Sequence, residues 1–193
     1  MNKKQSTIID HVAIDFFDSY SIVNLELSES HSFYDSTINI GYSDSGDLEA
    51  LFHEMAHLIY ATPRQAFAET NWGYKSNYNG EFNGRWFENV IDLEVKVMVL
   101  AYALLDHYQV EDWILSYEDY AETLSDGLYN SISSFLSNEE NAFQEIVEDY
   151  DDIHGYIYDK LLNALNSYNF SFKEIKTMWH NKCQELKALR GEI

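Results

Sequence analysis

One stretch combines a helical pattern of apolar residues with a pair of histidines: LEALFHEMAHLI, residues 48–59. Its apolar side chains recur at steps of three and four and form one face that a core would bury. His53 and His57 are four residues apart, so on a helix both imidazoles lie on one side and can reach one ion. We expect the helix to begin near residues 45–47 and to end before Pro63, because a proline disfavours helix in the preceding residue.

The five residues from His53 to His57 have the form H-E-x-x-H. The two histidines are the expected ligands of Zn²⁺, and Glu54 is placed to act as general base on a water molecule whose pKa the ion lowers. A catalytic zinc ion needs a third protein ligand. We expect Glu94, which would be a lone carboxylate on the apolar stripe of the next long helix and costly to bury without a partner.

This motif resembles that of the zincin metallopeptidases in the gluzincin arrangement, over roughly residues 36–105. The resemblance implies a zinc-dependent hydrolysis of peptide bonds in a peptide or protein substrate. The stretch at 92–97 looks like the acid-rich start of the ligand helix in small phage-type H-E-x-x-H proteins of the ImmA/IrrE kind, which favours Glu94. Glu88 is the alternative third ligand, because Glu88 to Asp92 resembles the E-x-x-x-D of thermolysin-like enzymes.

The remaining patterns predict a mainly α fold (α+β) with a small β-hairpin before the H-E-x-x-H helix. Apolar periodicity indicates a helix at about 6–20, and alternation at 22–27 and 37–42 indicates the two hairpin strands. Asn- and Gly-rich residues at 64–85 read as a loop, followed by a helix from 86 to about 107 and at least three more. The last helix should start at a Ser171/Glu174 capping box and close near Gly191.

Nothing in these patterns indicates a domain boundary, so we expect a single domain over 1–193, with a metal-site core (36–105) and an acidic helical part (106–193). Zincins usually place an edge strand beside the metal, and residues 37–42 stand in the right order for it. A transition-state stabiliser could come from His154, Tyr156 or His180, among which the sequence does not choose.

Composition limits the partners. The formal charge of −21 repels phosphate backbones and anionic membrane surfaces, so we expect neither direct nucleic-acid binding nor membrane binding. No stretch approaches the ~18 apolar residues of a membrane span. Cys183 is the only cysteine, which excludes an internal disulfide and favours the cytoplasm.

Residues 106–159 contain fifteen acidic side chains and no Lys or Arg. These acids could be solvated helix faces, or a surface that presents carboxylates in place of DNA phosphates to a basic nucleic-acid-binding protein. Segments 78–86 and 111–118 resemble motifs of the ArdA antirestriction family, which supports this second function. A third alternative is a metal-binding module without peptidase activity.

Overall fold

The computed structural model describes residues 3–20, 22–28, 33–34, 39–43, 48–62, 82–110, 116–137, 142–150 and 152–191. Helices dominate these residues, which confirms the mainly α fold class. The helices are α1 (Lys3–Val12), the π-helical η1 (Ala13–Phe17), α2 (Leu48–Tyr60), α5 (Gly84–His107), α6 (Tyr117–Leu136), α7 (Ala142–Asp149), α8 (Ile153–Ser167) and α9 (Phe172–Arg190). The strands are β1 (Asn24–Ser28), β2 (Phe33–Tyr34) and β3 (Asn39–Ser43).

The three strands form one small sheet in the order β1-β3-β2. The predicted hairpin is wrong in its direction, because β1 pairs with β3 in parallel, with Leu25 opposite Ile40. Antiparallel pairing instead joins β3 to β2, where Tyr34 lies opposite Ile40. The expectation that 37–42 supplies the edge strand is also wrong, because β3 is paired on both sides and β2 is an edge. Alternation identifies a strand but does not specify the direction of its partner.

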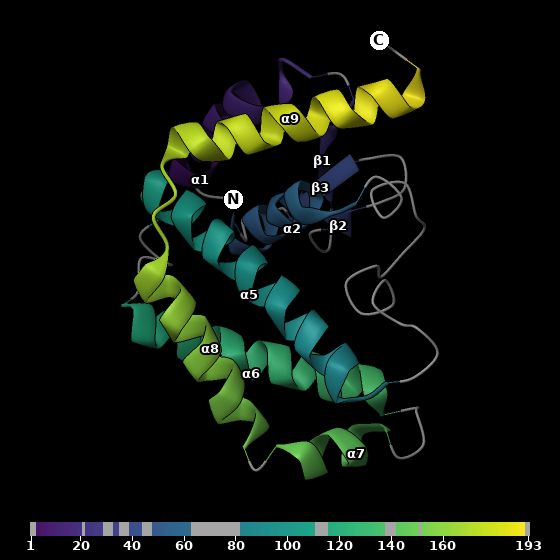
Figure 1. Ribbon diagram of the computed structural model, residues 1–193. Helices are drawn as coiled ribbons and strands as arrows, with labels where there is room; N and C mark the ends of the chain where they lie inside the picture. Colours follow the sequence, from purple (N-terminus) through teal and green to yellow (C-terminus); the bar gives the residue numbers. More distant parts are fainter. Residues whose placement is uncertain are drawn as a thin grey trace.

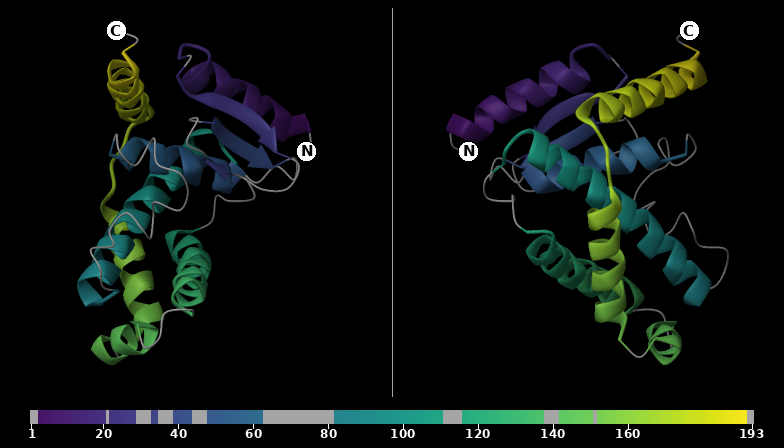
Figure 2. Two further views of the ribbon diagram at one scale, coloured as in Figure 1. Left: turned by 90° about the vertical axis from the view of Figure 1, so that its right-hand side faces the viewer. Right: turned by 60° about the vertical axis from the view of Figure 1, so that its left-hand side comes forward.

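The elements form an upper and a lower group joined by α5 (Figure 1). The upper group holds α1, the sheet, α2 and α9, and the lower group holds α6, α7 and α8. The sheet lies between α1 on one side and α2 on the other (Figure 2). One core of buried apolar side chains runs through both groups.

Helix α2 packs chiefly against α5, and this contact positions the H-E-x-x-H residues. Leu51, Phe52, Met55 and Leu58 are fully buried on α2, as the apolar periodicity predicts. Helix α5 is buried on almost every side, since elements of both groups pack on it. Burying a side chain of this size contributes about 1.5–3 kcal/mol, so the two helices are held in a fixed relation.

Side-chain caps start several helices. The Asn83 side chain accepts a hydrogen bond from the backbone N–H of Trp86, so α5 starts at Gly84, two residues before the predicted start. The rest of the loop predicted at 64–85 lies almost wholly outside the described residues. The predicted capping box is present on α9, where Ser171 and Glu174 satisfy each other's backbone N–H, and Gly191 closes the helix in the left-handed conformation.

The last helix, α9, ties the upper group together from above (Figure 1). The Lys182 ammonium donates to the backbone carbonyl of Ala61, directly after the end of α2. The Trp179 indole N–H donates to the carbonyl of Phe16 in η1, at the other end of the chain. A cation at a helix C-terminus is stabilising, so α9 helps to fix the end of the motif helix. Among the described helices, none combines the length and apolar character needed to cross a membrane.

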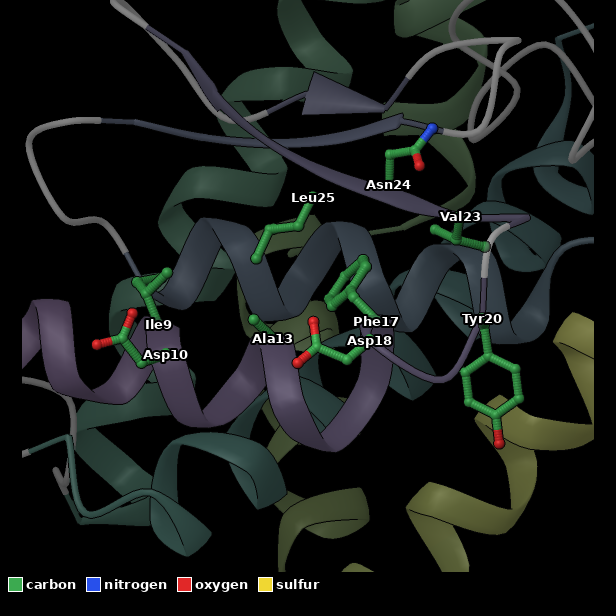
Figure 3. Close-up of a pocket in the computed structure, with 9 residues that line it drawn as sticks. All are labelled: Ile9, Asp10, Ala13, Phe17, Asp18, Tyr20, Val23, Asn24 and Leu25. Atoms are coloured by element: carbon green, nitrogen blue, oxygen red, sulfur yellow. The ribbon is translucent and has the colours of Figure 1, made fainter.

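A groove of about 500 Å³ lies between α1–η1 and β1. Figure 3 shows Ile9, Ala13 and Phe17 along the helix side, facing Val23 and Leu25 of the neighbouring segment. The π turn, in which the Asp18 N–H donates to the Ala13 carbonyl, is wider than an α turn and carries this row of side chains along the groove. None of the groove residues belongs to the H-E-x-x-H segment.

Candidate metal centre

His53, His57 and Glu94 come together where α2 crosses α5. Their side chains are the one group of three or more possible metal ligands found among the described residues. The two Nε2 atoms are 3.0 Å apart, and Glu94 Oε2 lies 3.5 Å from Nε2 of His53 and 3.4 Å from Nε2 of His57. Glu94 comes from the apolar stripe of α5, where its side chain is only 6% exposed. The structure therefore places a buried carboxylate between the two imidazoles.

The two Glu94 distances suit ligands of one zinc ion better than direct hydrogen bonds, whereas the 3.0 Å between the two histidine nitrogens fits either arrangement. Ligand atoms about 2.0–2.1 Å from a tetrahedral ion lie about 3.3 Å from one another. A charge-assisted hydrogen bond between His and Glu would bring the atoms to about 2.7–2.9 Å. The two Glu94 distances are longer than that and close to the tetrahedral edge. Two imidazole nitrogens and one carboxylate oxygen are also a ligand set that catalytic zinc uses, with a fourth position left for water.

The pKa of each of the three side chains depends on the charge of one or both of the others. Burial raises the pKa of Glu94, but the neighbouring His57 and His53 outweigh it, so the net pKa is lowered and the carboxylate stays ionised. For His57, burial acts to lower the pKa, but Glu94 outweighs it and the pKa is raised. Burial and the neighbouring His57 lower the pKa of His53 to about 4. These shifts favour an ionised Glu94 and a neutral His53, and they favour the protonated form of His57, whose proton a metal ion would have to displace.

Glu54 follows His53 on α2 and is partly buried next to this cluster. Burial raises its pKa, and the negative charge of Glu94 acts in the same direction, while His57 opposes the shift. A carboxylate with a raised pKa is a better proton acceptor near neutral pH. Its place beside the ligands and its increased basicity fit the predicted role of general base.

Glu88, the alternative third ligand, lies in a different environment. Its two oxygens accept hydrogen bonds from the hydroxyls of Tyr150 and Tyr156, each at 2.6 Å, and from Nζ of Lys160 at 3.0 Å. Lys160 also contacts Asp92 at 2.6 Å. This network joins α5 to α8 and to the end of α7. Glu88 is thus part of a contact between helices, and Glu94 is the acid that lies with the two histidines.

The three predicted candidates for a transition-state stabiliser have partners elsewhere. Tyr156 donates to Glu88, and His180 pairs with the hydroxyl of Tyr20 at 2.6 Å. His154 Nε2 contacts Asp126 at 2.7 Å and the buried Ser125 hydroxyl at 3.2 Å. This Ser-His-Asp group is not a catalytic triad, because both partners contact the same imidazole nitrogen.

Glu49 is a neighbour of the cluster that the sequence analysis did not single out. It lies one turn before His53 on α2, and its Oε1 is 4.0 Å from His53 Nδ1. The signal was available, because residues four apart share a helix face. An acid in the first turn of a helix is so common at the surface, however, that its position in the sequence does not distinguish a buried role.

The structure describes only some residues of the acidic part, 106–193. Its described carboxylates on α6 are exposed: Glu118, Asp119, Glu122 and Asp126. Of the segments that resemble the antirestriction family, 78–81 and 111–115 lie outside the described residues, while 82–86 and 116–118 lie within them.

Comparisons with protein-family models, with curated proteins and with solved structures each found no match for this chain. A functional assignment therefore rests on the cluster of His53, His57 and Glu94 and its geometry.

Proposed function

We propose that this chain binds one zinc ion through His53, His57 and Glu94 and hydrolyses peptide bonds with Glu54 as general base. The observation that carries the proposal is the spacing of the three ligand atoms, 3.0, 3.4 and 3.5 Å, which is near the edge length of a zinc tetrahedron. When bound, zinc lowers the pKa of water and polarises a carbonyl group. Glu54 accepts the proton of the attacking water and returns it to the leaving amine.

The small sheet supports a peptide as the substrate. Strand β2 is an edge of the described sheet, and it contacts α2, which carries the motif. An extended peptide can add to such an edge through backbone hydrogen bonds. A substrate bound there runs beside the helix that holds His53 and His57.

Zinc content tests the first half of the proposal. Elemental analysis of the purified parent should give one zinc per chain, and His53→Ala and His57→Ala should each lose it, because two ligands rarely hold the ion against competition. The control is Glu122→Gln, which changes an exposed acid of α6 and should keep a full equivalent. A full equivalent of zinc in both histidine variants would exclude this site.

Hydrolysis tests the second half. The zinc-loaded parent is incubated with an unbiased peptide library, and products are identified by mass spectrometry. Glu54→Gln keeps the side chain's size, so its zinc content should match the parent, while its cleavage rate should fall by about 10²–10⁴. A zinc-loaded parent that cleaves nothing would reduce the chain to a metal-binding module, and a Glu54→Gln variant that cleaves as fast as the parent would exclude Glu54 as the general base.

Binding of a basic partner is the second candidate function. One observation favours it: Glu118, Glu122 and Asp126 follow one another at four-residue steps on α6 and are all exposed. Residues four apart share a helix face, so these carboxylates form a row. Binding to a basic nucleic-acid-binding protein should weaken steeply between about 50 and 200 mM salt and persist in His53→Ala. Binding whose strength does not depend on the salt concentration would contradict this second function.

A further inference from the structure

The two nitrogens of the His53 ring face different groups. Nε2 points to the cluster, 3.0 Å from Nε2 of His57 and 3.5 Å from Glu94 Oε2. Nδ1 faces Oε1 of Glu49, at 4.0 Å, one helical turn earlier on α2. A histidine that binds a metal through Nε2 carries its remaining proton on Nδ1, where an acceptor can orient the ring. Glu49 stands on the side where such an acceptor is needed.

Glu49 is held inside the molecule. Its side chain is 12% exposed, although it lies in the first turn of a helix, where acids are commonly solvated. The fully buried Tyr120 of α6 lies near it: burial raises the pKa of Tyr120 well above its usual value, and the negative charge of Glu49 adds to this effect. The Tyr120 hydroxyl itself donates to the carbonyl of Met98 on α5 at 3.2 Å. Glu49 is thus enclosed where α2 meets residues of α5 and α6.

We propose that Glu49 is a positioning residue of the metal centre, whose carboxylate accepts a hydrogen bond from Nδ1–H of His53. A movement of about 1 Å brings the two atoms from 4.0 Å to hydrogen-bond distance. The bond fixes the tautomer in which Nε2 is free to bind the ion, and it increases the basicity of that nitrogen. The inference rests on the proposed zinc site but does not depend on peptidase activity.

The same arrangement connects the centre to the acidic part of the chain. Tyr120 on α6 lies close enough to Glu49 to feel its charge, Glu49 faces His53, and His53 faces Glu94 and His57.

Zinc affinity tests the proposal. The dissociation constant is measured by competition with a chromophoric chelator for the parent, Glu49→Ala, Glu49→Gln and the control Glu122→Gln. Loss of an acceptor behind a ligand histidine typically costs 10- to 100-fold in affinity, which we expect for Glu49→Ala. Glu49→Gln should lose less, because its amide oxygen can still accept the hydrogen bond from Nδ1–H of His53. Glu122→Gln, which removes the same charge from an exposed position, should match the parent.

An NMR signal distinguishes loss of the His53 ring orientation from a general effect of the substitution on the fold. In zinc-loaded protein with ¹⁵N-labelled histidine, the parent should show an Nδ1–H of His53 that exchanges slowly with water, and Glu49→Ala should lose this signal. The melting temperature of each zinc-free variant is recorded alongside, and if Glu49→Ala does not fold, Glu49→Gln supplies the comparison. Parent-like zinc affinity in the folded variants would overturn the role of Glu49 alone. A parent that binds no zinc would instead overturn the proposed function.

Discussion

Exchanging two glutamates of α5 for glutamine should separate the metal centre from the helix contact beside it. Glu94→Gln removes a ligand charge from a side chain that is 6% exposed and lies 3.4 and 3.5 Å from the two histidine nitrogens. Its zinc affinity should fall by more than the roughly 10- to 100-fold that supporting residues contribute. Glu88→Gln should leave zinc affinity unchanged, because its oxygens contact Tyr150, Tyr156 and Lys160 instead.

The Glu88 variant should show its effect in stability. A hydrogen bond to a charged group contributes about 1.5–3 kcal/mol when it is shielded from water. The Glu88 side chain is 40% exposed and glutamine retains one acceptor oxygen, so we expect a net loss of about 1–2 kcal/mol for the network. For a chain of this size that corresponds to a fall in melting temperature of about 2–8 °C.

Chelator competition measures zinc affinity, and circular dichroism of the zinc-free proteins measures the melting temperature. The two variants carry the same chemical change on the same helix, so each is the control of the other. Loss of zinc from Glu88→Gln together with retention in Glu94→Gln would refute the assignment and make Glu88 the third ligand. Loss from both would mean that the network around Glu88 and the metal centre are coupled through α5.

Three further predictions can be checked on the same preparations. Free zinc at about 100 times its dissociation constant should add about 2.7 kcal/mol, or about 5–11 °C in melting temperature, to the parent and nothing to His53→Ala; an equal shift in both would place the zinc elsewhere. Burial acts to raise the pKa of Asp15, but its hydrogen bond from Lys176 and its other partners lower it overall, so the carboxylate stabilises the fold above about pH 3.9 and loses this effect as the pH falls through the lowered value. Asp15→Asn should therefore be about 1–2 kcal/mol less stable in urea at pH 7, and this difference should shrink as the pH falls through the lowered pKa of Asp15, whereas a constant difference would contradict the linkage. Burial raises the pKa of Cys183 to about 12, so a thiol reagent should modify it at pH 8 only after unfolding, and rapid modification of the folded protein would show that the thiol is accessible.

The cluster of His53, His57 and Glu94 was largely predictable from the sequence because the signals for it lie within single helices. The spacing of His53 and His57 defines one helix face, and Glu94 interrupts an otherwise apolar stripe, where a carboxylate needs a partner. The structure brings these three side chains together. The capping box at Ser171 and Glu174 was predictable for the same reason, since both of its hydrogen bonds form within one turn.

Features that depend on distant partners were not predictable in this way. The pattern of β1 and β3 indicates strands, but their parallel direction depends on β2, which has only two residues and shows no alternation of its own. Glu88 and Glu94 are both acids of one helix, and what distinguishes them is that the partners of Glu88 lie on α8 and after α7. In the sequence Glu49 looks like any first-turn acid, and only the fold shows its low exposure and the nearby Tyr120 of α6.

The hydrogen bond from α9 to the end of α2 can form only late in protein synthesis. Lys182 reaches the carbonyl of Ala61, and Trp179 reaches that of Phe16, yet both residues leave the ribosome long after α2 and α5. In a nascent chain, His53, His57 and Glu94 have therefore been synthesised before Lys182 is available to bind the carbonyl at the end of α2. Until α9 has been made, the carbonyl at the end of α2 lacks the cation that Lys182 supplies.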